Sequence, residues 1–207
     1  MSTSFANTKP ALLLIDVQQG FVQEDFFGGN RNNPEAEAHC GQLLAAWRAR
    51  GLPIFHVRHS SQNPHSPLHA SNSGFQFCAQ VQPQGDEPVI TKTVNSAFIG
   101  TNLKELIKAG PIATLIERLD ALGITTLVIA GITTNHCVST SVRMAGNYGF
   151  AVYCAHDACA CFDRTGILGE HYPAETIHLT ALANLHGEFA QVASTAHILR
   201  MLSPLEN

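Results

Sequence analysis

The sequence predicts an α/β fold in which helices cover both faces of a mostly parallel sheet, a three-layer αβα sandwich. Short apolar runs rich in strand-forming residues alternate with segments of helical spacing, which is typical of parallel sheets with right-handed crossovers. The run ITTLVIAG, at 124–131, is the most continuous buried strand, and a helical segment follows it. With 207 residues and 45% hydrophobic content, the chain is long enough for one sizeable core and short for two. We therefore expect a single domain over 1–207.

The predicted elements follow one another along the chain with clear boundaries. The strands are expected at 10–16, 53–58, 88–92, 124–131, 150–155 and 188–193. Helices are expected at 34–50, at 135–148 and after Pro173. The segment 101–122 has helical spacing but contains Gly110-Pro111, so we expect two short helices there.

Composition and charge narrow the class of partner. The net charge is −4 and no Lys/Arg cluster is present, which argues against binding to nucleic acid or to an anionic membrane surface. No run approaches the roughly 20 apolar residues that span a bilayer, so we expect no membrane segment and a cytoplasmic location. Only 14% of residues are charged, which suggests surface buried in a homo-oligomer, a dimer or tetramer. Six cysteines without a CxxC pair predict free thiols. The partner is expected to be a small-molecule substrate.

Three reactive side chains fall at the carboxyl ends of predicted strands, the edge at which parallel α/β sheets bind ligands. Asp16 ends the first strand, Lys92 ends the third, and Cys137 follows the fourth through a short turn. Taken singly, each has a structural explanation, as a loop carboxylate, a solvated charge and a small buried hydrophobe respectively. Together, a carboxylate, an ammonium and a thiol at one edge form the set of an activated nucleophile. We expect all three to be catalytic.

The position of Cys137 favours attack on a carbonyl carbon. A thiol in the first turn of a helix meets unpaired N–H groups and the positive end of the helix dipole, which favour the thiolate, and Lys92 would add to this effect. Asp16 can accept the thiol proton and later return it to a leaving amine. The turn GITTNHC, at 131–137, can point successive backbone N–H groups at an oxyanion.

Several motifs carry a family resemblance over nearly the whole chain. LLLIDVQQGF, KTVNSAFIGTNL, AGITTNHCVSTSVRMAGNYGF and DACACFDRTG resemble segments of the isochorismatase-like cysteine hydrolases, which include nicotinamidase, N-carbamoylsarcosine amidohydrolase and ureidoacrylate amidohydrolase. The resemblance implies a six-stranded, Rossmann-like sheet and a catalytic triad of Asp16, Lys92 and Cys137. It also implies a cis peptide before Thr133, with the N–H groups of Thr133 and Cys137 holding the oxyanion.

The sequence departs from nicotinamidases in the segment expected to hold a metal. Nicotinamidases bind a metal with an Asp-x-His pair and a further histidine after the second strand. Here HVRHSSQNPHSPLH supplies His56, His59, His65 and His69 but no aspartate. Without that carboxylate we expect polar loop contacts, with no metal and no other cofactor, and nicotinamidase activity is disfavoured.

The expected function is hydrolysis of an amide or ureido C–N bond through a cysteine thioester. Two alternatives stay open. One is an isochorismatase-type vinyl-ether hydrolase, in which the aspartate acts as acid and Cys137 has no task. The other is a thiol sensor or binding protein on the same fold, which leaves Asp16 and Lys92 without a task.

Substrate contacts are expected from residues next to the motifs. Five candidates could line a pocket for a small, flat or apolar amide: Phe21, Phe26, Thr134, His136 and Phe162. Core packing is the alternative for the aromatic rings. Arg164 and Tyr172, after the fifth strand, are expected to bind a polar substituent or a neighbouring subunit. The fold does not fix the substrate itself.

Overall fold

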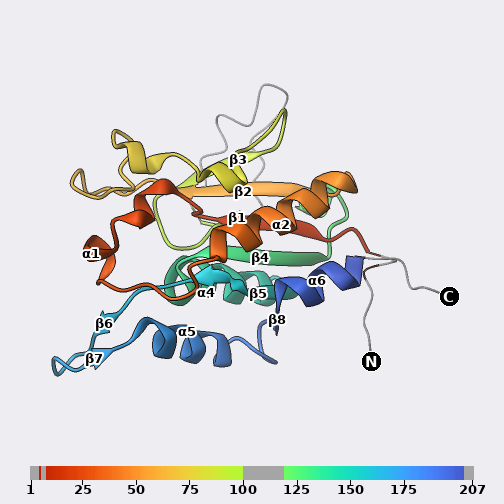
Figure 1. The fold of residues 1–207 in the computed structure, drawn as a ribbon. Helices are drawn as coiled ribbons and strands as arrows, with labels where there is room; N and C mark the ends of the chain where they lie inside the picture. The colour runs from red at the N-terminus through yellow and green to blue at the C-terminus, as the bar shows by residue number, and fades with distance from the viewer. Residues whose placement is uncertain (1–4, 6–7, 100–118, 203–207) are drawn as a thin grey trace.

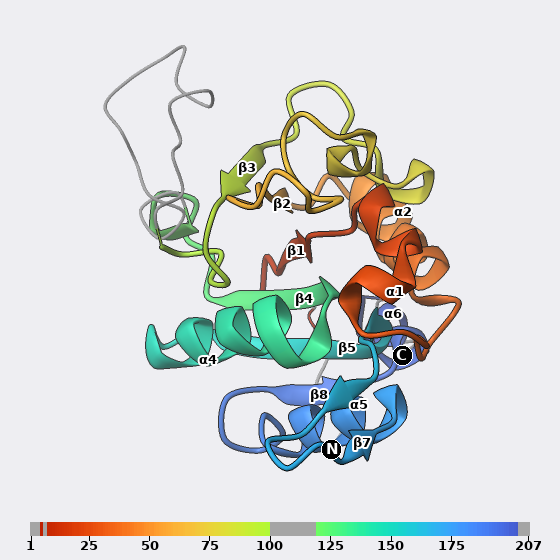
Figure 2. The ribbon, with the colours of Figure 1, turned by 90° about the vertical axis from the view of Figure 1, so that its left-hand side faces the viewer.

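The computed structural model describes residues 5, 8–99 and 119–202, and a six-stranded sheet forms its centre. The strands are β1 (Ala11–Ile15), β2 (Ile54–His59), β3 (Val89–Lys92), β4 (Thr126–Ile132), β5 (Ala151–Ala160) and β8 (Gln191–Ala193). Their order is β3-β2-β1-β4-β5-β8, and every neighbouring pair is parallel (Figure 2). The predicted fold class is therefore confirmed.

The strand order creates a switch point between β1 and β4. From β1 the chain builds one half of the sheet through β2 and β3, and it then returns to build the other half from β4. The connections that leave β1 and β4 consequently diverge, and in parallel α/β sheets ligands bind at the carboxyl ends of strands at such a point. Asp16 and Cys137 lie just beyond those ends.

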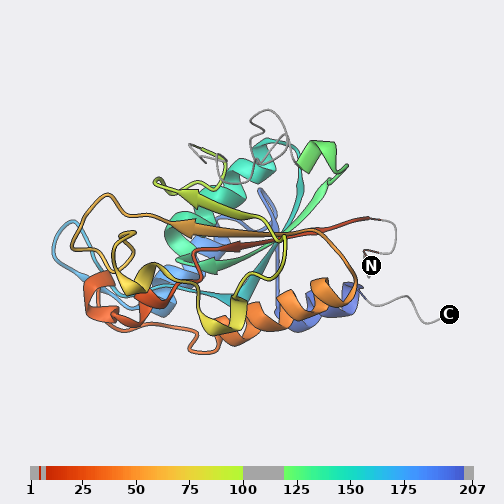
Figure 3. The same cartoon turned by 90° about the horizontal axis from the view of Figure 1, so that it is seen from above.

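Helices cover both faces of the sheet, which makes three layers (Figure 3). On one face, α2 (Ala36–Ala49) and α6 (Thr195–Leu202) pack on the even-numbered side chains of β1, Leu12 and Leu14. On the other face, α4 (Ser139–Asn147) and α5 (Ala174–Ala183) contribute to a core that contains Leu13 and Ile15. Because both faces are covered, β1 and β4 are buried at every residue, as their continuous apolar runs predict.

The spacing of apolar residues explains why α2 forms where it does. Its buried residues recur at three- and four-residue intervals and so form one stripe along the helix: Ala36, Cys40, Leu43, Leu44 and Trp47. The Trp47 side chain is completely buried, and its indole N–H donates to the carbonyl oxygen of Pro10 at 2.8 Å. That bond ties the end of α2 to the start of β1.

Several elements differ from the predictions, β5, α6 and β8 among them. Strand β5 continues to Ala160, because it shifts register between the pairs Ile129–Cys154 and Gly131–Cys159 and then rejoins β4. Helix α6 is absent from the predictions. At its first residue, the Thr195 N–H donates at 2.7 Å to the carboxylate of Asp157, which lies in the shifted part of β5. The last strand, β8, is shorter than predicted.

Short elements close the carboxyl end of the sheet. Helix α1 (Glu24–Phe27) and the hairpin of β6 (Arg164–Thr165) and β7 (His171–Tyr172) lie together at one end of the molecule (Figure 1). Ile167 and Leu168, in the hairpin turn, are 98% and 89% exposed. The predicted break at Gly110-Pro111 lies outside the described residues. Within the described ranges, no helix has the length and apolar character needed to cross a membrane.

Candidate active site

Backbone geometry at the strand ends places the two charged residues of the predicted triad. Asp16 follows β1 with a φ of 54°, in the left-handed region that aspartate tolerates better than most residues. Its N–H donates to the Val57 carbonyl oxygen at 2.8 Å, which extends the pairing of β1 with β2 by one residue. Lys92 is the last residue of β3. Both side chains are completely buried and point toward each other.

The three predicted catalytic side chains meet at this edge. The Lys92 Nζ donates to Asp16 Oδ2 at 2.5 Å and to Cys137 Sγ at 3.3 Å. The other carboxylate oxygen, Asp16 Oδ1, is buried without a hydrogen-bond partner among the described residues. The Lys92 ammonium thus bridges Asp16 and Cys137, and the oxygen Asp16 Oδ1 remains available as a hydrogen-bond acceptor.

The turn that carries Cys137 depends on a close approach between β4 and β1. Gly131 has a φ of 134°, and a Cβ atom there would overlap the backbone of Ile15. The peptide bond between Ile132 and Thr133 is cis, as the family resemblance implies. A π-helix (Thr134–Val138) then precedes α4, where we expected an α-helix from residue 135. The Thr133 carbonyl oxygen accepts the N–H groups of His136 and Val138, both at 3.2 Å. The oxyanion role of Thr133 and Cys137 stays a prediction.

The environment of the site sets its resting charges. Burial alone would lower the pKa of Lys92, but the Asp16 carboxylate raises it overall, so Lys92 is an ammonium. Burial and then the Asp16 carboxylate raise the pKa of the Cys137 thiol to about 12, against the opposing effect of Lys92. The resting thiol is therefore neutral. The helix start and Lys92, which were expected to favour the thiolate, are therefore outweighed by burial and by Asp16.

Two residues that were not predicted to belong to the active site also contact the triad. His59 Nδ1 lies 3.3 Å from Lys92 Nζ, and the Cys137 thiol is 3.9 Å from Asn95 Oδ1. His59 is the last residue of β2, so the strand-end rule that selects Lys92 would have found it with the strand one residue longer. Asn95 lies in the quoted motif that begins at Lys92, which is the available signal for it.

A buried polar network supports the turn from behind. Thr134 Oγ1 and His178 Nδ1 are 2.9 Å apart, and His178 Nε2 lies 3.4 Å from Asn33 Nδ2. The Asn33 amide also donates to the Cys159 carbonyl oxygen at 2.7 Å. Thr134, expected to contact substrate, is completely buried and is bonded instead to a helix that covers the sheet. No local pattern in the sequence links these three residues.

The predicted aromatic contacts divide into buried and exposed rings. Phe21 and Phe162 are 4% and 0% exposed, and they stack with ring centroids 6.0 Å apart in a small apolar cluster with Phe27. Their geometry fits the core-packing alternative. Phe26 is 47% exposed, with its ring against that of Phe27. Contact between substrate and any of these rings stays a prediction.

His136 and Arg164 form a polar pair next to the nucleophile. Arg164 Nη2 lies 3.3 Å from His136 Nδ1, and partial burial followed by the Arg164 charge lowers the pKa of His136. Arg164 Nε is buried without a hydrogen-bond partner in the part of the chain that the structure describes. Tyr172 donates its hydroxyl to Glu170 at 2.9 Å. Among the described residues, Arg164 has no carboxylate partner. It lies beside His136, the residue that precedes Cys137.

The histidines expected to make polar loop contacts have different surroundings. His56 is buried and its Nε2 lies 2.8 Å from Glu87 Oε2, and His69 bonds to Ser71. Only His59 reaches the triad. Its ring nitrogen, an Asp16 oxygen and Cys137 Sγ lie within 4.8 Å of one another, a spacing that suits a metal ion, but the Lys92 ammonium is within hydrogen-bond distance of all three groups.

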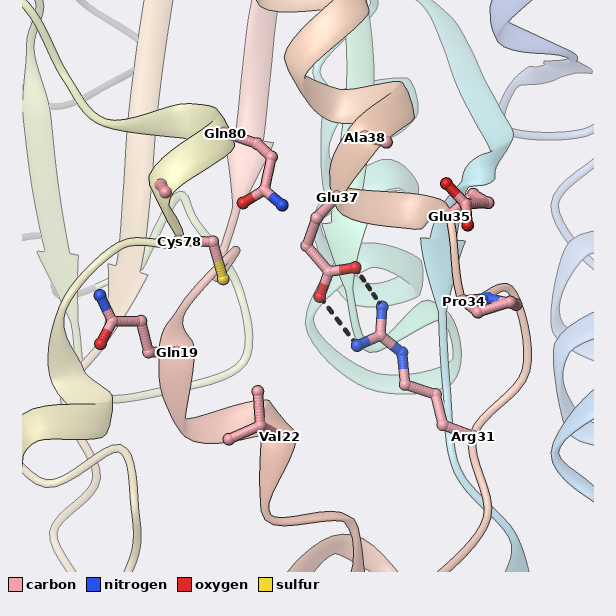
Figure 4. A pocket seen from close by; sticks show the side chains of 10 residues that line it. Gln19, Val22, Arg31, Pro34, Glu35, Glu37, Ala38, Cys78 and Gln80 are labelled. Atoms are coloured by element: carbon pink, nitrogen blue, oxygen red, sulfur yellow. Dashed lines mark hydrogen bonds and ion pairs between the residues drawn. The ribbon is translucent and has the colours of Figure 1, made fainter.

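A separate cavity of about 590 Å³ opens beside the start of α2 (Figure 4). Gln19, Cys78 and Gln80 face a bidentate pair in which Arg31 donates to Glu37 at 2.6 and 2.8 Å. Burial raises the pKa of the Cys78 thiol to about 11. With no triad residue in its lining, a neutral thiol and a compensated ion pair, this cavity offers no activated nucleophile.

Comparison with known proteins identifies the family of this chain. The isochorismatase domain model matches residues 10–197. YrdC, an isochorismatase family protein of Bacillus subtilis, is 43% identical over 92% of this chain and 95% of its own length. Maleamate amidohydrolase of Pseudomonas putida is 31% identical over 69% of this chain and 68% of its own. A crystal structure of an isochorismatase-family protein from Chromobacterium violaceum is 44% identical, with a TM-score of 0.84 over 97% of both chains. The chain therefore belongs to the isochorismatase family and is a hydrolase.

Proposed function

We propose that the chain is a cysteine hydrolase that cleaves the C–N bond of a small amide or ureide. The observation that carries this proposal is the double hydrogen bond of Lys92, whose Nζ reaches both Asp16 Oδ2 and Cys137 Sγ. The bridge holds a base, a cation and a nucleophile within reach of one carbonyl group. The similarity to maleamate amidohydrolase supports the same class of bond.

The reaction would begin with proton transfer, because the resting thiol is neutral. Asp16 takes the thiol proton as Sγ bonds to the carbonyl carbon, and the C=O electron pair moves to the oxygen. The backbone N–H groups of Thr133 and Cys137 hold that oxyanion. When the intermediate collapses, the C–N bond breaks and Asp16 returns the proton to the leaving nitrogen.

Hydrolysis of the thioester completes the cycle with the same groups. Asp16 takes a proton from water as the water oxygen bonds to the thioester carbon. The C–S bond then breaks, the sulfur regains a proton from Asp16, and the acid product is released. Lys92 remains an ammonium throughout and stabilises the negative charge that develops on sulfur.

We infer that Arg164 contacts a polar or anionic substituent of the substrate. Its Nη2 lies 3.3 Å from the His136 Nδ1, and among the described residues no carboxylate pairs with it. Arg164 is partly buried and its Nε is buried without a hydrogen-bond partner, so a substrate anion would supply a charge-assisted partner for the guanidinium. Maleamate, the substrate in the name of one relative, is an amide that carries a carboxylate.

Two alternatives are less well supported. A vinyl-ether hydrolase of the isochorismatase type needs an acid but no thiol, and so leaves the contact between Cys137 and Lys92 unexplained. A thiol sensor needs an accessible thiolate, whereas burial and Asp16 raise the pKa of the Cys137 thiol to about 12.

The test is release of ammonia or amine from a panel of small amides and ureides, with and without a carboxylate. We expect Cys137→Ala to abolish turnover and Cys78→Ala, at the partly buried cysteine of the separate cavity, to retain it. Acid-quenched wild-type enzyme should carry an acyl group on the Cys137 peptide in mass spectrometry. Turnover that survives in Cys137→Ala would overturn the proposal.

A further inference from the structure

Among the described residues, the Lys92 ammonium has as many hydrogen-bond acceptors around it as it has protons. An ammonium carries three N–H donors and no acceptor. Around Lys92 Nζ lie Asp16 Oδ2 at 2.5 Å, His59 Nδ1 at 3.3 Å and Cys137 Sγ at 3.3 Å. Two of these groups belong to the proposed triad, and the third does not.

We propose that His59 is a positioning residue, which fixes the Lys92 ammonium between Asp16 and Cys137 by accepting its third N–H. The expected effect on turnover rests on the proposed cysteine hydrolase function. The expected effect on the reactivity of the thiol does not, because it depends only on where the Lys92 charge lies.

The sheet itself sets His59 beside Lys92. These two residues are partners in the parallel pairing of β2 and β3, at the last position of both strands. Gln18, two residues after Asp16, accepts the His59 N–H at 2.8 Å with its side-chain oxygen. Its side-chain nitrogen donates to the His59 carbonyl oxygen at 3.1 Å and to the Phe75 carbonyl oxygen at 2.9 Å. The segment that follows Asp16 is thereby locked to the end of β2.

The protonation state of the ring agrees with an acceptor role. Burial and then the Lys92 charge lower the pKa of His59, against the smaller opposing effects of Asp16 and a hydrogen bond to the Val94 backbone. A neutral ring can present an unprotonated Nδ1 to the ammonium and carry its proton on Nε2. A protonated ring would instead place two cations in contact. Among the described residues, the charged groups that act on the pKa of His59 are Asp16, which follows β1, and Lys92, from β3.

The test compares two substitutions of similar shape that differ in the acceptor. His59→Asn keeps an oxygen close to the position of Nδ1, whereas His59→Leu fills the space without any acceptor. His65→Ala, at an exposed histidine of the same segment, is the control. The readouts are kcat and KM for the best substrate, and the rate at which iodoacetamide labels the Cys137 peptide at pH 8, with the Cys78 peptide as internal reference.

The proposal makes a distinct prediction for each variant. In His59→Leu, kcat and the labelling rate of Cys137 should each fall about tenfold, the scale of one hydrogen bond to a charged group, with KM unchanged. In His59→Asn both should stay within about threefold of wild type. Labelling of Cys78 should be the same in all variants. Should His59→Leu fail to fold, His59→Ala takes its place, and added imidazole should restore the labelling of Cys137.

The outcomes separate this proposal from the proposed function. Equal behaviour of His59→Leu and His59→Asn, whether both resemble wild type or both lose activity, would overturn the acceptor role. Activity that survives Cys137→Ala would overturn the hydrolase mechanism. The labelling comparison at Cys137 would still decide whether His59 positions Lys92.

Discussion

Replacement of Lys92 by methionine should destabilise the protein strongly. The side chains of Lys92 and Asp16 are both completely buried, with Nζ and Oδ2 2.5 Å apart. Removing one partner of a buried pair leaves an uncompensated charge and costs about 3–5 kcal/mol. In a chain of this size, each 1 kcal/mol shifts the melting temperature by roughly 2–4 °C. Lys92→Met should therefore melt roughly 6–20 °C below wild type.

The assay is thermal unfolding at pH 7, followed by circular dichroism, on a double-mutant cycle. Asp16→Asn alone should also be strongly destabilising, because it leaves the Lys92 ammonium without its carboxylate. The double variant removes both charges and should recover at least half of the summed loss. Lys9→Met, at an exposed lysine, is the control and should stay within about 0.5 kcal/mol of wild type.

The stability that Lys92 contributes should fall at high pH. The folded protein raises the pKa of Lys92 above its ordinary value of 10.5. The stability that Lys92 contributes is thus fully present below pH 10.5 and is lost as the pH rises through the raised value. The gap between wild type and Lys92→Met should stay wide from neutral pH to about pH 10 and narrow above it. The buried ion pair would be refuted if Lys92→Met had the melting temperature of wild type. It would also be refuted if the double variant lost the full sum of the stability lost by the two single variants.

Two further predictions concern the turn that carries the nucleophile. Gly131→Ala should lower the free energy of unfolding by about 2–4 kcal/mol, because its Cβ would overlap the backbone of Ile15 at a positive φ. The measurement is urea denaturation, and an unchanged free energy of unfolding would contradict the close approach of β4 and β1. Burial and Asp16 raise the pKa of the Cys137 thiol to about 12, so the rate at which iodoacetamide labels it should keep rising about tenfold per pH unit from pH 7 to 10. A rate that reaches a plateau below pH 9 would show that the thiolate is already formed.

The parts of the site that follow from topology could be predicted from the sequence. Parallel strands present their carboxyl ends at one edge, so the residues that end the first and third strands had to lie at the same edge as the turn after the fourth. No distance was needed for that inference. The same rule extends to His59: the strand predicted at 53–58 stops one residue before it, whereas β2 ends at His59.

Other features depend on contacts between distant segments, which no local pattern encodes. His178 is 44 residues from Thr134 and 145 from Asn33, yet it lies between them in space. The ionisation of Cys137 is a similar case. The helix start and Lys92 could be inferred from the sequence, but the burial that outweighs them is a property of the packed structure. Phe21 and Phe162 could be placed near the motifs, although their stacking on each other could not.

Because the resting Cys137 thiol is neutral, the proposed reaction depends both on the Lys92–Asp16 ion pair and on the contact of Lys92 with His59. Burial and Asp16 raise the pKa of the Cys137 thiol to about 12, so the thiol is neutral at pH 7 and its proton must leave as the sulfur attacks. That transfer requires Asp16 to be charged and Lys92 to lie against the sulfur, and the same ion pair stabilises the fold. A Lys92 variant therefore loses stability and chemistry at once. The His59 variants leave both charges in place, so a loss of reactivity in His59→Leu but not in His59→Asn would isolate the position of the ammonium as the cause.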